Sequence, residues 1–310
     1  MLYSARSIDM LRRVAVKVPA TTANLGPGFD CLGMALDVWN YITVRTETEG
    51  IIVYGEGADS ISLQKDNLIY RSVVALFDKA NMTPPKLSIS SRNEIPLSRG
   101  LGSSAAAIVG GLVAGNEMAG RPLGLEDLLK MASSLEGHSD NVAPALIGGC
   151  QIVVKDAERP FTNSVSMPEG LEVVLFIPDM PMPTDKARAV LAPSVSREDA
   201  VFNLGRVALL VNAFTTGNLA LLRVATQDRL HQPSRQAMFP AMKSIFRAAL
   251  EAGAAGVFLS GSGSTILALT HGKEMTVGYE MAEAARKANV SGRLKVTKPT
   301  KLGAHIVEAE

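Results

Sequence analysis

The sequence predicts an α+β protein with two domains. Segments with the two-residue apolar period of strands occur in both halves of the chain, mixed with segments that have the 3.6-residue period of helices. The chain has 310 residues, which is about twice the usual size of a domain. A polar stretch at residues 155–170 separates two apolar strand candidates. We therefore expect one domain over residues 1–160 and another over residues 161–310.

The first half begins with strand candidates. Valines alternate with other residues from Arg13 onward, which predicts a strand with one buried face that stops at Pro19. Residues 41–47 and 51–54 are two further strand candidates, separated by a polar turn that contains a glycine. The first fifty residues therefore favour a meander of neighbouring strands.

Helices follow in the first half. Asp66 is a candidate cap for a helix with apolar residues at helical spacing, namely Ile69, Val73, Leu76, Phe77 and Ala80. Residues 86–90 are a short strand candidate, after which a glycine-rich loop opens into an alanine-rich helix within residues 95–120. A second amphipathic helix covers residues 125–135, and residues 151–154 form the next strand candidate.

The second half has its own pattern of helices and strands. Ser196 and Asp199 fit a capping box at the start of one helix, and Pro240 fits the first turn of another that ends at Gly253. The remaining expected elements are strands at residues 173–177, 257–259 and 265–269, a helix at residues 274–288, and strands near Leu294 and Ile306.

Composition and charge exclude several classes of protein. Lys and Arg total 31 and Asp and Glu total 30, so a net charge of +1 provides no general attraction to nucleic acid or to an anionic membrane. No apolar stretch is long enough to span a bilayer. Residues 1–13 lack the apolar segment of a secretory signal, although they leave an organellar leader open. Cys31 and Cys150 form no CxxC or Cys/His cluster, so we expect a cytoplasmic protein.

The segment Gly-Leu-Gly-Ser-Ser-Ala at residues 100–105 is the first candidate site. Its glycines allow the backbone to approach a ligand, and the helix that starts at the serines directs unpaired N–H groups toward it. The alternative is a serine-capped helix after a flexible loop. The letters also match a dinucleotide fingerprint, but residues 96–99 interrupt the strand that such a site requires, and a Walker lysine motif is absent. A nucleotide triphosphate would therefore be held by backbone amides, with Ser104 available to Mg²⁺.

Three segments together resemble the GHMP small-molecule kinases. They are VPATTANLGPGFDCLGMAL at residues 18–36, PLSRGLGSSAA at residues 96–106 and GVFLSGSGSTILAL at residues 256–269. Three shorter segments are similar to the branch of this family that phosphorylates L-homoserine, and these are GHSDNVAPALIGG at residues 137–149, TDKAR at residues 184–188 and HQPSR at residues 231–235.

The resemblance implies a fold and a set of ligands. The N-terminal domain would be ribosomal-protein-S5-like, with a left-handed β-α-β unit, and the C-terminal domain would be ferredoxin-like. ATP and L-homoserine would meet between them with Mg²⁺, and a homodimer is possible. Ser104 and Glu136 would bind the metal, and Asn67 and Leu68 would lie near the adenine. The phosphates would contact the loop of Pro96, Leu97, Ser98, Arg99, Gly100, Leu101, Gly102, Ser103, Ser104, Ala105 and Ala106.

The resemblance also implies roles for the amino-acid site. Asp30 would bind the substrate ammonium, while Arg188 and Arg235 would grip its carboxylate, a task that suits the planar guanidinium. Taken alone, Asp30 could instead cap a helix near Cys31, and each arginine could be a surface charge. The reacting hydroxyl would be surrounded by Asn24, His138, Asp140 and Asn141, of which Asn24, Asp140 and Asn141 are the catalytic candidates, and Gly263 would also contact substrate.

Some questions stay open at this point. Ser264 stands where relatives commonly have proline, so the third motif would be less rigid. Asp140 would act either as a base or only as a positioning group, and positioning is favoured because phosphoryl transfer through a loose transition state needs little base catalysis. The alternatives to homoserine phosphorylation are a related kinase acting on a mevalonate-like or sugar-like alcohol, and a non-catalytic sensor of nucleotide or amino acid.

Overall fold

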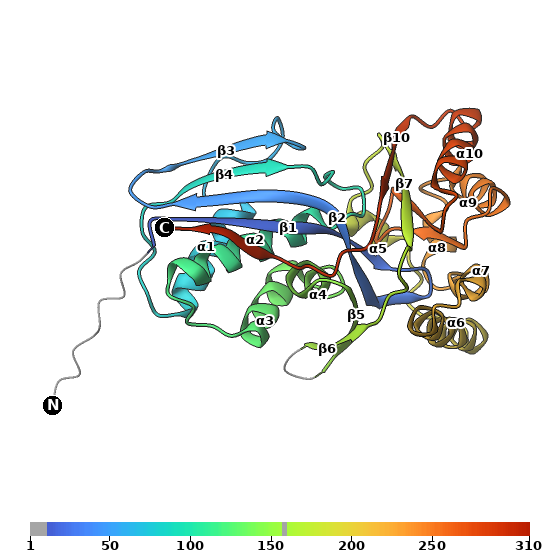
Figure 1. Ribbon diagram of the computed structural model, residues 1–310, viewed down its shortest axis with the longest axis horizontal. Coiled ribbons are helices and arrows are strands. Elements are labelled where there is room, and N and C mark those ends of the chain that lie inside the picture. The colour runs from blue at the N-terminus through green and yellow to red at the C-terminus, as the bar shows by residue number, and fades with distance from the viewer. Residues whose placement is uncertain (1–10, 157–159) are drawn as a thin grey trace.

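The computed structural model describes residues 11–156 and 160–310 (Figure 1). The question of a leader in residues 1–10 lies outside this range. A seven-stranded sheet covered by helices occupies one end of the molecule, and a four-stranded sheet with two helices against it occupies the other. The expected α+β class is therefore confirmed.

The first two strands are longer than the sequence pattern indicated. β1 (Arg13–Asn24) and β2 (Gly28–Arg45) pair antiparallel along nearly their whole length. The expected stop at Pro19 is wrong, because an irregularity in the register between Pro19 and Ala20 accommodates the proline and the pairing continues beyond it. Residues 28–40 showed no strand alternation because β2 is buried on both faces over much of this stretch.

The next strand does not continue the meander. β3 (Gly50–Gly55) pairs parallel with β4 (Ser88–Asn93), and β4 lies between β2 and β3. The meander expectation is wrong because α1 (Leu68–Lys79) carries the chain across the sheet, giving the β-α-β unit that the resemblance implied. Asn67, not Asp66, caps α1, and its side-chain oxygen accepts a hydrogen bond from the Ile69 N–H at 2.9 Å.

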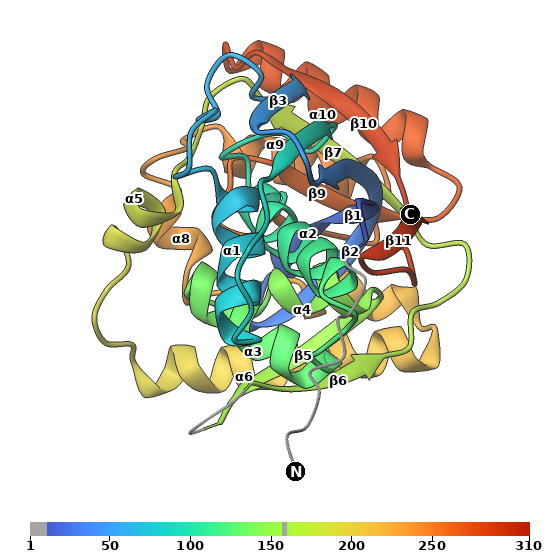
Figure 2. The same ribbon diagram turned by 90° about the vertical axis from the view of Figure 1, so that its left-hand side faces the viewer.

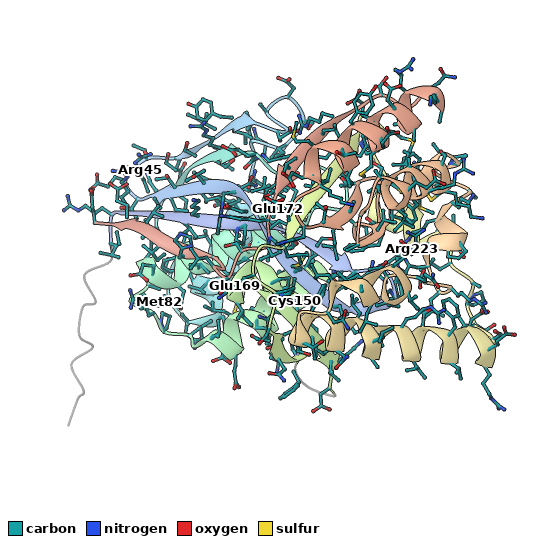
Figure 3. The ribbon with its side chains drawn as sticks, turned by 45° about the vertical axis from the view of Figure 1, so that its right-hand side comes forward. Arg45, Met82, Cys150, Glu169, Glu172 and Arg223 are labelled. Carbon is teal, nitrogen blue, oxygen red and sulfur yellow. The ribbon has the colours of Figure 1, made fainter. Side chains whose placement is uncertain are left out.

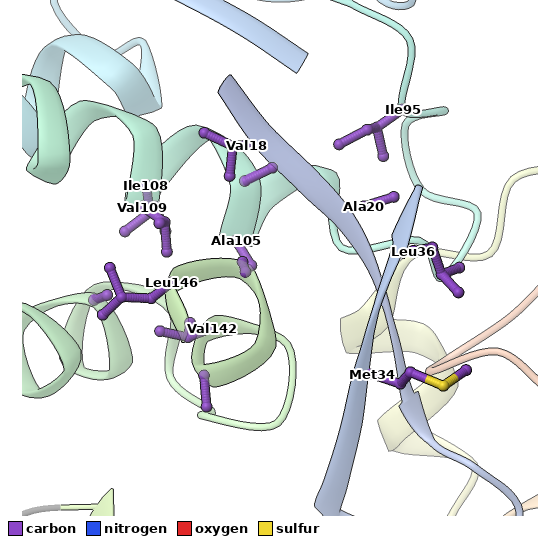
Figure 4. Packing of buried hydrophobic residues seen from close by; sticks show 14 of the residues in the cluster. Val18, Ala20, Met34, Leu36, Ile95, Ala105, Ile108, Val109, Val142 and Leu146 are labelled. Atoms are coloured by element: carbon purple, nitrogen blue, oxygen red, sulfur yellow. The ribbon is translucent and has the colours of Figure 1, made fainter. Parts of the chain in front are cut away.

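The helices of this part cover one face of the seven-stranded sheet. α2 (Ser103–Met118), α3 (Leu125–Glu136) and α4 (Val142–Ile147) lie there with α1 (Figures 1 and 2). Val18 of β1, Ala105 of α2 and Val142 of α4 belong to the buried cluster between sheet and helices (Figure 4). α2 is rich in small residues because it is tightly enclosed, and a Cβ on Gly110 would lie 2.4 Å from the Ile42 side chain.

The sheet is completed from both sides of the expected domain boundary. β5 (Cys150–Lys155) pairs with β2, and β6 (Pro160–Val165) pairs with β5 as a polar, mostly exposed edge strand that the sequence pattern did not reveal. β11 (His305–Ala309) returns from the C-terminal end to pair with β1. The division at residue 160 therefore does not coincide with the division between the sheets, and the domain boundary stays a prediction.

The four-stranded sheet has the order β10-β7-β9-β8 and is antiparallel throughout. Its strands are β7 (Glu172–Pro178), β8 (Gly256–Leu259), β9 (Ile266–Thr270) and β10 (Gly292–Thr297), and α9 (Met242–Glu251) and α10 (Glu274–Lys287) pack on it. Neighbouring residues of β7 face opposite sides, so Leu175 belongs to the first core and Phe176 to the second. This strand order and packing correspond to the expected ferredoxin-like sandwich.

The remaining helices lie along the chain between β7 and β8 of the four-stranded sheet. They are α5 (Thr184–Ala189), α6 (Arg197–Thr216), the 3₁₀ turn η1 (Leu219–Leu221), α7 (Leu222–Ala225) and α8 (Gln232–Arg235). Ser196 caps α6 by accepting from the Asp199 N–H at 3.0 Å, as expected. Pro240 precedes α9 by two residues and does not lie in its first turn. None of the helices within residues 11–156 and 160–310 combines the length and apolar character needed to cross a membrane.

Candidate active site

A cavity of about 130 Å³ lies where the two sheets meet. It adjoins a second cavity of about 210 Å³, because Ser98, Ser103 and Ser104 line both. The loop of residues 96–104 lines the first cavity, except for Leu97. The other expected residues that line it are Asn24, Asp30, Glu136, His138, Asp140, Asn141, Arg188 and Arg235. The fold thus gathers side chains from segments more than 200 residues apart.

The glycine-rich loop is held by its carbonyl groups. The carbonyl of Leu101 accepts from the Thr21 N–H at 3.1 Å, and that of Arg99 accepts from the Thr265 N–H at 3.1 Å. The Ser260 hydroxyl donates to the Gly100 carbonyl at 2.6 Å. The first-turn N–H groups of α2 have no acceptor within the helix, so they are available to an anion at its N-terminus.

Gly102 is required for a different reason from the one the sequence suggested. Its φ of 70° lies in the left-handed region, and a Cβ there would lie 1.9 Å from the Thr21 hydroxyl. The glycine therefore allows β1 to approach the loop, rather than keeping a side chain out of the ligand. Ala105 and Ala106 are fully buried in the core and do not line the cavity.

Arg99 anchors the loop to the C-terminal sheet. Its guanidinium donates to the carbonyl groups of Pro178 at 2.8 Å, of Leu97 at 2.9 Å and of Asp179. Burial lowers its pKa from the ordinary value. Arg99 thus uses its donors to fix the position of the loop.

Four polar side chains form a connected cluster at the end of α2. The Ser104 hydroxyl donates to Glu136 Oε2 at 2.6 Å, and His138 Nδ1 lies 2.7 Å from Asp140 Oδ1. His138 Nε2 lies 3.7 Å from Glu136 Oε1, so the imidazole stands between two carboxylates. Burial raises the pKa of Glu136. Burial also lowers the pKa of His138, but the hydrogen bond to Asp140 and the charges of both carboxylates outweigh it, so the net shift is upward.

Ser104 and Glu136 fit a magnesium ion. Their hydroxyl and carboxylate oxygens meet at the helix N-terminus, and Mg²⁺ in nucleotide sites takes one or two such protein ligands with phosphate oxygens and water completing its shell. Glu117, an acidic residue in the last turn of α2, pairs instead with Arg121 at 2.7 Å. In the described part of the chain, no three His, Cys, Asp or Glu side chains cluster as a metal site.

The two asparagines of the site are held by hydrogen bonds within the protein. Asn24 donates from Nδ2 to the Gly261 carbonyl at 2.9 Å and accepts from the Asp30 N–H at 3.0 Å. Asn141 Oδ1 accepts from the Thr21 hydroxyl at 2.8 Å. Thr21 was not expected from the sequence, since its role depends on a contact across 120 residues.

The charged groups of the site differ in their pairing. Arg188 grips Asp30 with two hydrogen bonds of 2.7 and 3.0 Å, which raise the pKa of Arg188. Asp30 lies in β2 and caps no helix. Arg235 is 2% exposed and donates to neutral acceptors, the carbonyls of Ala187 and Gly261 and Nδ1 of His231. Burial, and then the charge of Arg188, lower the pKa of Arg235 to about 10.

Asn67 and Leu68 line the 210 Å³ cavity together with Leu97. The Asn67 side chain is engaged in capping α1 and in donating to the Ser62 carbonyl at 2.8 Å, so it shapes this cavity as part of the helix end. The structure thus has two adjoining cavities, with Ser98, Ser103 and Ser104 of the loop in the lining of both.

The third motif closes the other side of the site. Gly261 and Ser262 line the cavity, whereas Gly263 packs against Gly100. Ser264 is fully buried, and its hydroxyl donates to the Met180 carbonyl at 2.5 Å. This hydrogen bond anchors the loop at the position where relatives commonly have proline.

Several site residues were not expected individually. Thr184 and Ser262 line the cavity. Phe29 lies 5.6 Å from each of the guanidiniums of Arg188 and Arg235 and stacks on His231. Both Phe29 and His231 belong to segments that carried the family resemblance, which is the signal that could have identified them.

Two family models match this chain. The family model described as "GHMP kinases N terminal domain" matches residues 67–149, and the one described as "GHMP kinases C terminal" matches residues 210–289. The chain belongs to the GHMP kinase family.

Several similar sequences are homoserine kinases. The chain is 44% identical over 293 residues to the homoserine kinase of Moorella thermoacetica, covering 94% of this chain and 99% of that protein. It is 46% identical over 259 residues to the homoserine kinase of Synechocystis, covering 82% and 85%. The crystal structure of homoserine kinase from Cytophaga hutchinsonii superposes with a TM-score of 0.86 at 28% identity, covering 99% and 100%. L. major mevalonate kinase shares the fold, with a TM-score of 0.70 at 15% identity over 96% and 99%.

Proposed function

We propose that this chain transfers the γ-phosphoryl group of ATP to the terminal hydroxyl of L-homoserine, forming O-phospho-L-homoserine for threonine biosynthesis. The observation that carries the proposal is the charge arrangement beside the phosphate loop. Asp30 and Arg188 offer one charge of each sign, and Arg235 adds a cation with no carboxylate partner among the described residues. A zwitterionic amino acid uses this combination, whereas mevalonate or a sugar has no ammonium group that could take the place of Arg188 at Asp30.

Substrate binding would exchange the internal ion pair for two external ones. The substrate ammonium would take the place of Arg188 at Asp30, and the carboxylate would lie between Arg188 and Arg235. The exchange keeps each charge compensated, which limits the cost of desolvation in a closed site. The bidentate geometry of guanidinium suits a carboxylate.

The reaction would then be an in-line displacement. The terminal hydroxyl oxygen forms a bond to the γ-phosphorus while the bond to the β–γ bridging oxygen breaks, and ADP leaves. Asn24, Asp140 and Asn141 would position the hydroxyl, and its proton would pass to Asp140 or to an oxygen of the transferred phosphoryl group. Mg²⁺, held by Ser104 and Glu136, would neutralise phosphate charge when bound.

Asp140 is set up mainly as a positioning group. It is 3% exposed, and its Oδ1 accepts from His138 and from the Asn141 N–H at 3.0 Å. These hydrogen bonds fix the orientation of the carboxylate. Its Oδ2 has no hydrogen-bond partner among residues 11–156 and 160–310, which leaves that oxygen for the hydroxyl of the substrate.

The test is an ADP-release assay on the purified chain with ATP, Mg²⁺ and a panel of homoserine, serine, threonine, mevalonate and galactose. We expect release with homoserine to exceed release with each of the others. Preference for mevalonate or galactose would assign the chain to a related kinase, and ATP binding without release on any alcohol would indicate a sensor.

Two further properties complete the proposal. We place the enzyme in the cytoplasm, supported by two free cysteines, of which Cys150 is buried in the interior (Figure 3). Burial raises the pKa of Cys150 to about 12 and that of Cys31 to about 11, so neither thiol is prone to oxidation through its thiolate. A homodimer is the oligomeric state that we propose, as the family resemblance implies.

A further inference from the structure

His231 is buried in the wall of the site and touches the arginine that is expected to bind substrate. Its ring is 0% exposed, with Nδ1 2.9 Å from Arg235 Nη1 and Nε2 2.7 Å from the Gly26 carbonyl. His231 lies at the N-terminus of α8, and Gly26 lies in the turn between β1 and β2. The imidazole thus connects the two segments that form opposite sides of the amino-acid site.

These two contacts determine where the ring proton is. A guanidinium has only donors, so Nδ1 must accept from Arg235 and cannot carry a proton. A carbonyl has only acceptors, so Nε2 carries the proton and donates to Gly26. His231 is therefore a neutral imidazole of defined tautomer. Desolvation lowers its pKa to about 4, which agrees with this state.

The neutral acceptor matters because of what else surrounds Arg235. The guanidinium donates from Nε to the Ala187 carbonyl at 3.2 Å and from Nη1 to the Gly261 carbonyl at 2.9 Å, and Nη2 has no acceptor in the described part of the chain. Its partners fix its plane without cancelling its charge. Arg188, in contrast, is already paired with a carboxylate.

We propose that His231 is a positioning residue that holds Arg235 as a charged, unpaired guanidinium with Nη2 directed to the substrate carboxylate. Phe29 supports the same arrangement, since its ring stacks on the imidazole at 5.3 Å between centroids. This inference rests on the proposed function, in which Arg235 binds the carboxylate of homoserine.

Two substitutions separate the two hydrogen bonds of the ring. In His231→Asn the amide oxygen takes the position of Nδ1 and can still accept from Arg235, while the donor to Gly26 is lost. In His231→Gln the amide nitrogen reaches the position of Nε2 and can still donate to Gly26, while the acceptor for Arg235 is lost. His271→Gln is the matched control, because His271 is exposed and hydrogen-bonds Gly170 far from the site.

The experiment measures KM and kcat for homoserine and KM for ATP in the full chain and these three variants. We expect His231→Gln to raise KM for homoserine at least about tenfold, with KM for ATP unchanged. We expect KM for homoserine in His231→Asn to stay near that of the parent, and KM for homoserine in His271→Gln to be unchanged. A higher KM for homoserine in His231→Asn than in His231→Gln, or an equal rise of KM in both variants, would overturn the proposal. Either result would show that the ring only connects α8 to the turn that contains Gly26.

A second measurement is independent of activity. ¹⁵N NMR of the imidazole nitrogens at neutral pH should show an unprotonated Nδ1 and a protonated Nε2 for His231, and the opposite tautomer would also refute the inference. A parent chain that does not phosphorylate homoserine would refute the proposed function, whereas a failed inference in a chain that does phosphorylate it would leave that function standing.

Discussion

Replacement of Arg235 by leucine tests the assignment of the amino-acid site most directly. The guanidinium is 2% exposed, and within the described residues it hydrogen-bonds two carbonyls and an imidazole nitrogen but no carboxylate. Removing one partner of a buried charge pair costs about 2–5 kcal/mol, which is roughly one and a half to three and a half decades of efficiency. Arg188 remains to compensate the carboxylate, so we expect the low end, a loss of about 30-fold in kcat/KM for homoserine.

The assay compares homoserine with 3-amino-1-propanol, which has the same ammonium and hydroxyl but no carboxylate. Arg235→Leu should lower kcat/KM for homoserine by the stated factor, while the value for the amino alcohol and KM for ATP should change little. An equal loss on both substrates would refute the reasoning, because the guanidinium would then act on something other than the carboxylate.

The substitution also removes hydrogen bonds to three acceptors, of which the Gly261 carbonyl keeps the hydrogen bond from Asn24. Each buried group that is left unsatisfied costs about 1–3 kcal/mol of stability. Urea unfolding of the variant therefore accompanies the kinetics. Arg235→Lys serves as a second variant that keeps the charge and loses the planar fork. We expect its efficiency with homoserine to lie between those of the parent and the leucine variant.

The remaining predictions concern the metal, the ammonium and acid stability. Ser104→Ala and Glu136→Gln should each raise the Mg²⁺ concentration that gives the half-maximal rate, and Glu117→Gln is the control in which this concentration should not change. If the rate of Glu136→Gln depends on Mg²⁺ as that of the parent does, Glu136 is not a metal ligand. Asp30→Asn should narrow the preference for homoserine over 4-hydroxybutyrate, and an unaltered ratio would place the ammonium elsewhere. Burial lowers the pKa of His231 in the folded chain from the ordinary 6.5 to about 4, against the opposing charge of Asp228 at 3.6 Å from Nε2, so the unfolded chain binds more protons between these values. Stability should therefore fall by up to about 3 kcal/mol as pH drops from 6.5 through 4, and urea unfolding at several pH values should show this slope in the parent and a flatter one in His231→Asn.

Local sequence signals were sufficient for several features that neighbouring residues decide, although the cap of α1 is Asn67 and not the expected Asp66. Gly137 ends α3 in the left-handed conformation, and Ser196 caps the start of α6. Both could be predicted because a cap residue bonds to groups within one helical turn of itself. The glycine-rich loop before α2 was recognised for the same reason. Motif order and spacing were sufficient to indicate the family.

Pairing over long distances was decided only by the tertiary structure. β1 continues past Pro19 and β2 extends through an apolar segment because each has a partner strand, which no local pattern specifies. The position of β4 between β2 and β3 depends in the same way on the crossover through α1.

The same distinction holds in the site. The residue types of Asp30, Arg188 and Arg235 were evident in the chain, but their pairing was not. Arg188 and Asp30 are 158 residues apart, and the ring of His231 reaches Gly26 across 205 residues. Which cation is neutralised and which stays free for substrate depends on distances of a few ångströms in a buried, weakly screened environment. The sequence therefore determined the chemical groups of the site, and the folded structure determined their charge state and orientation.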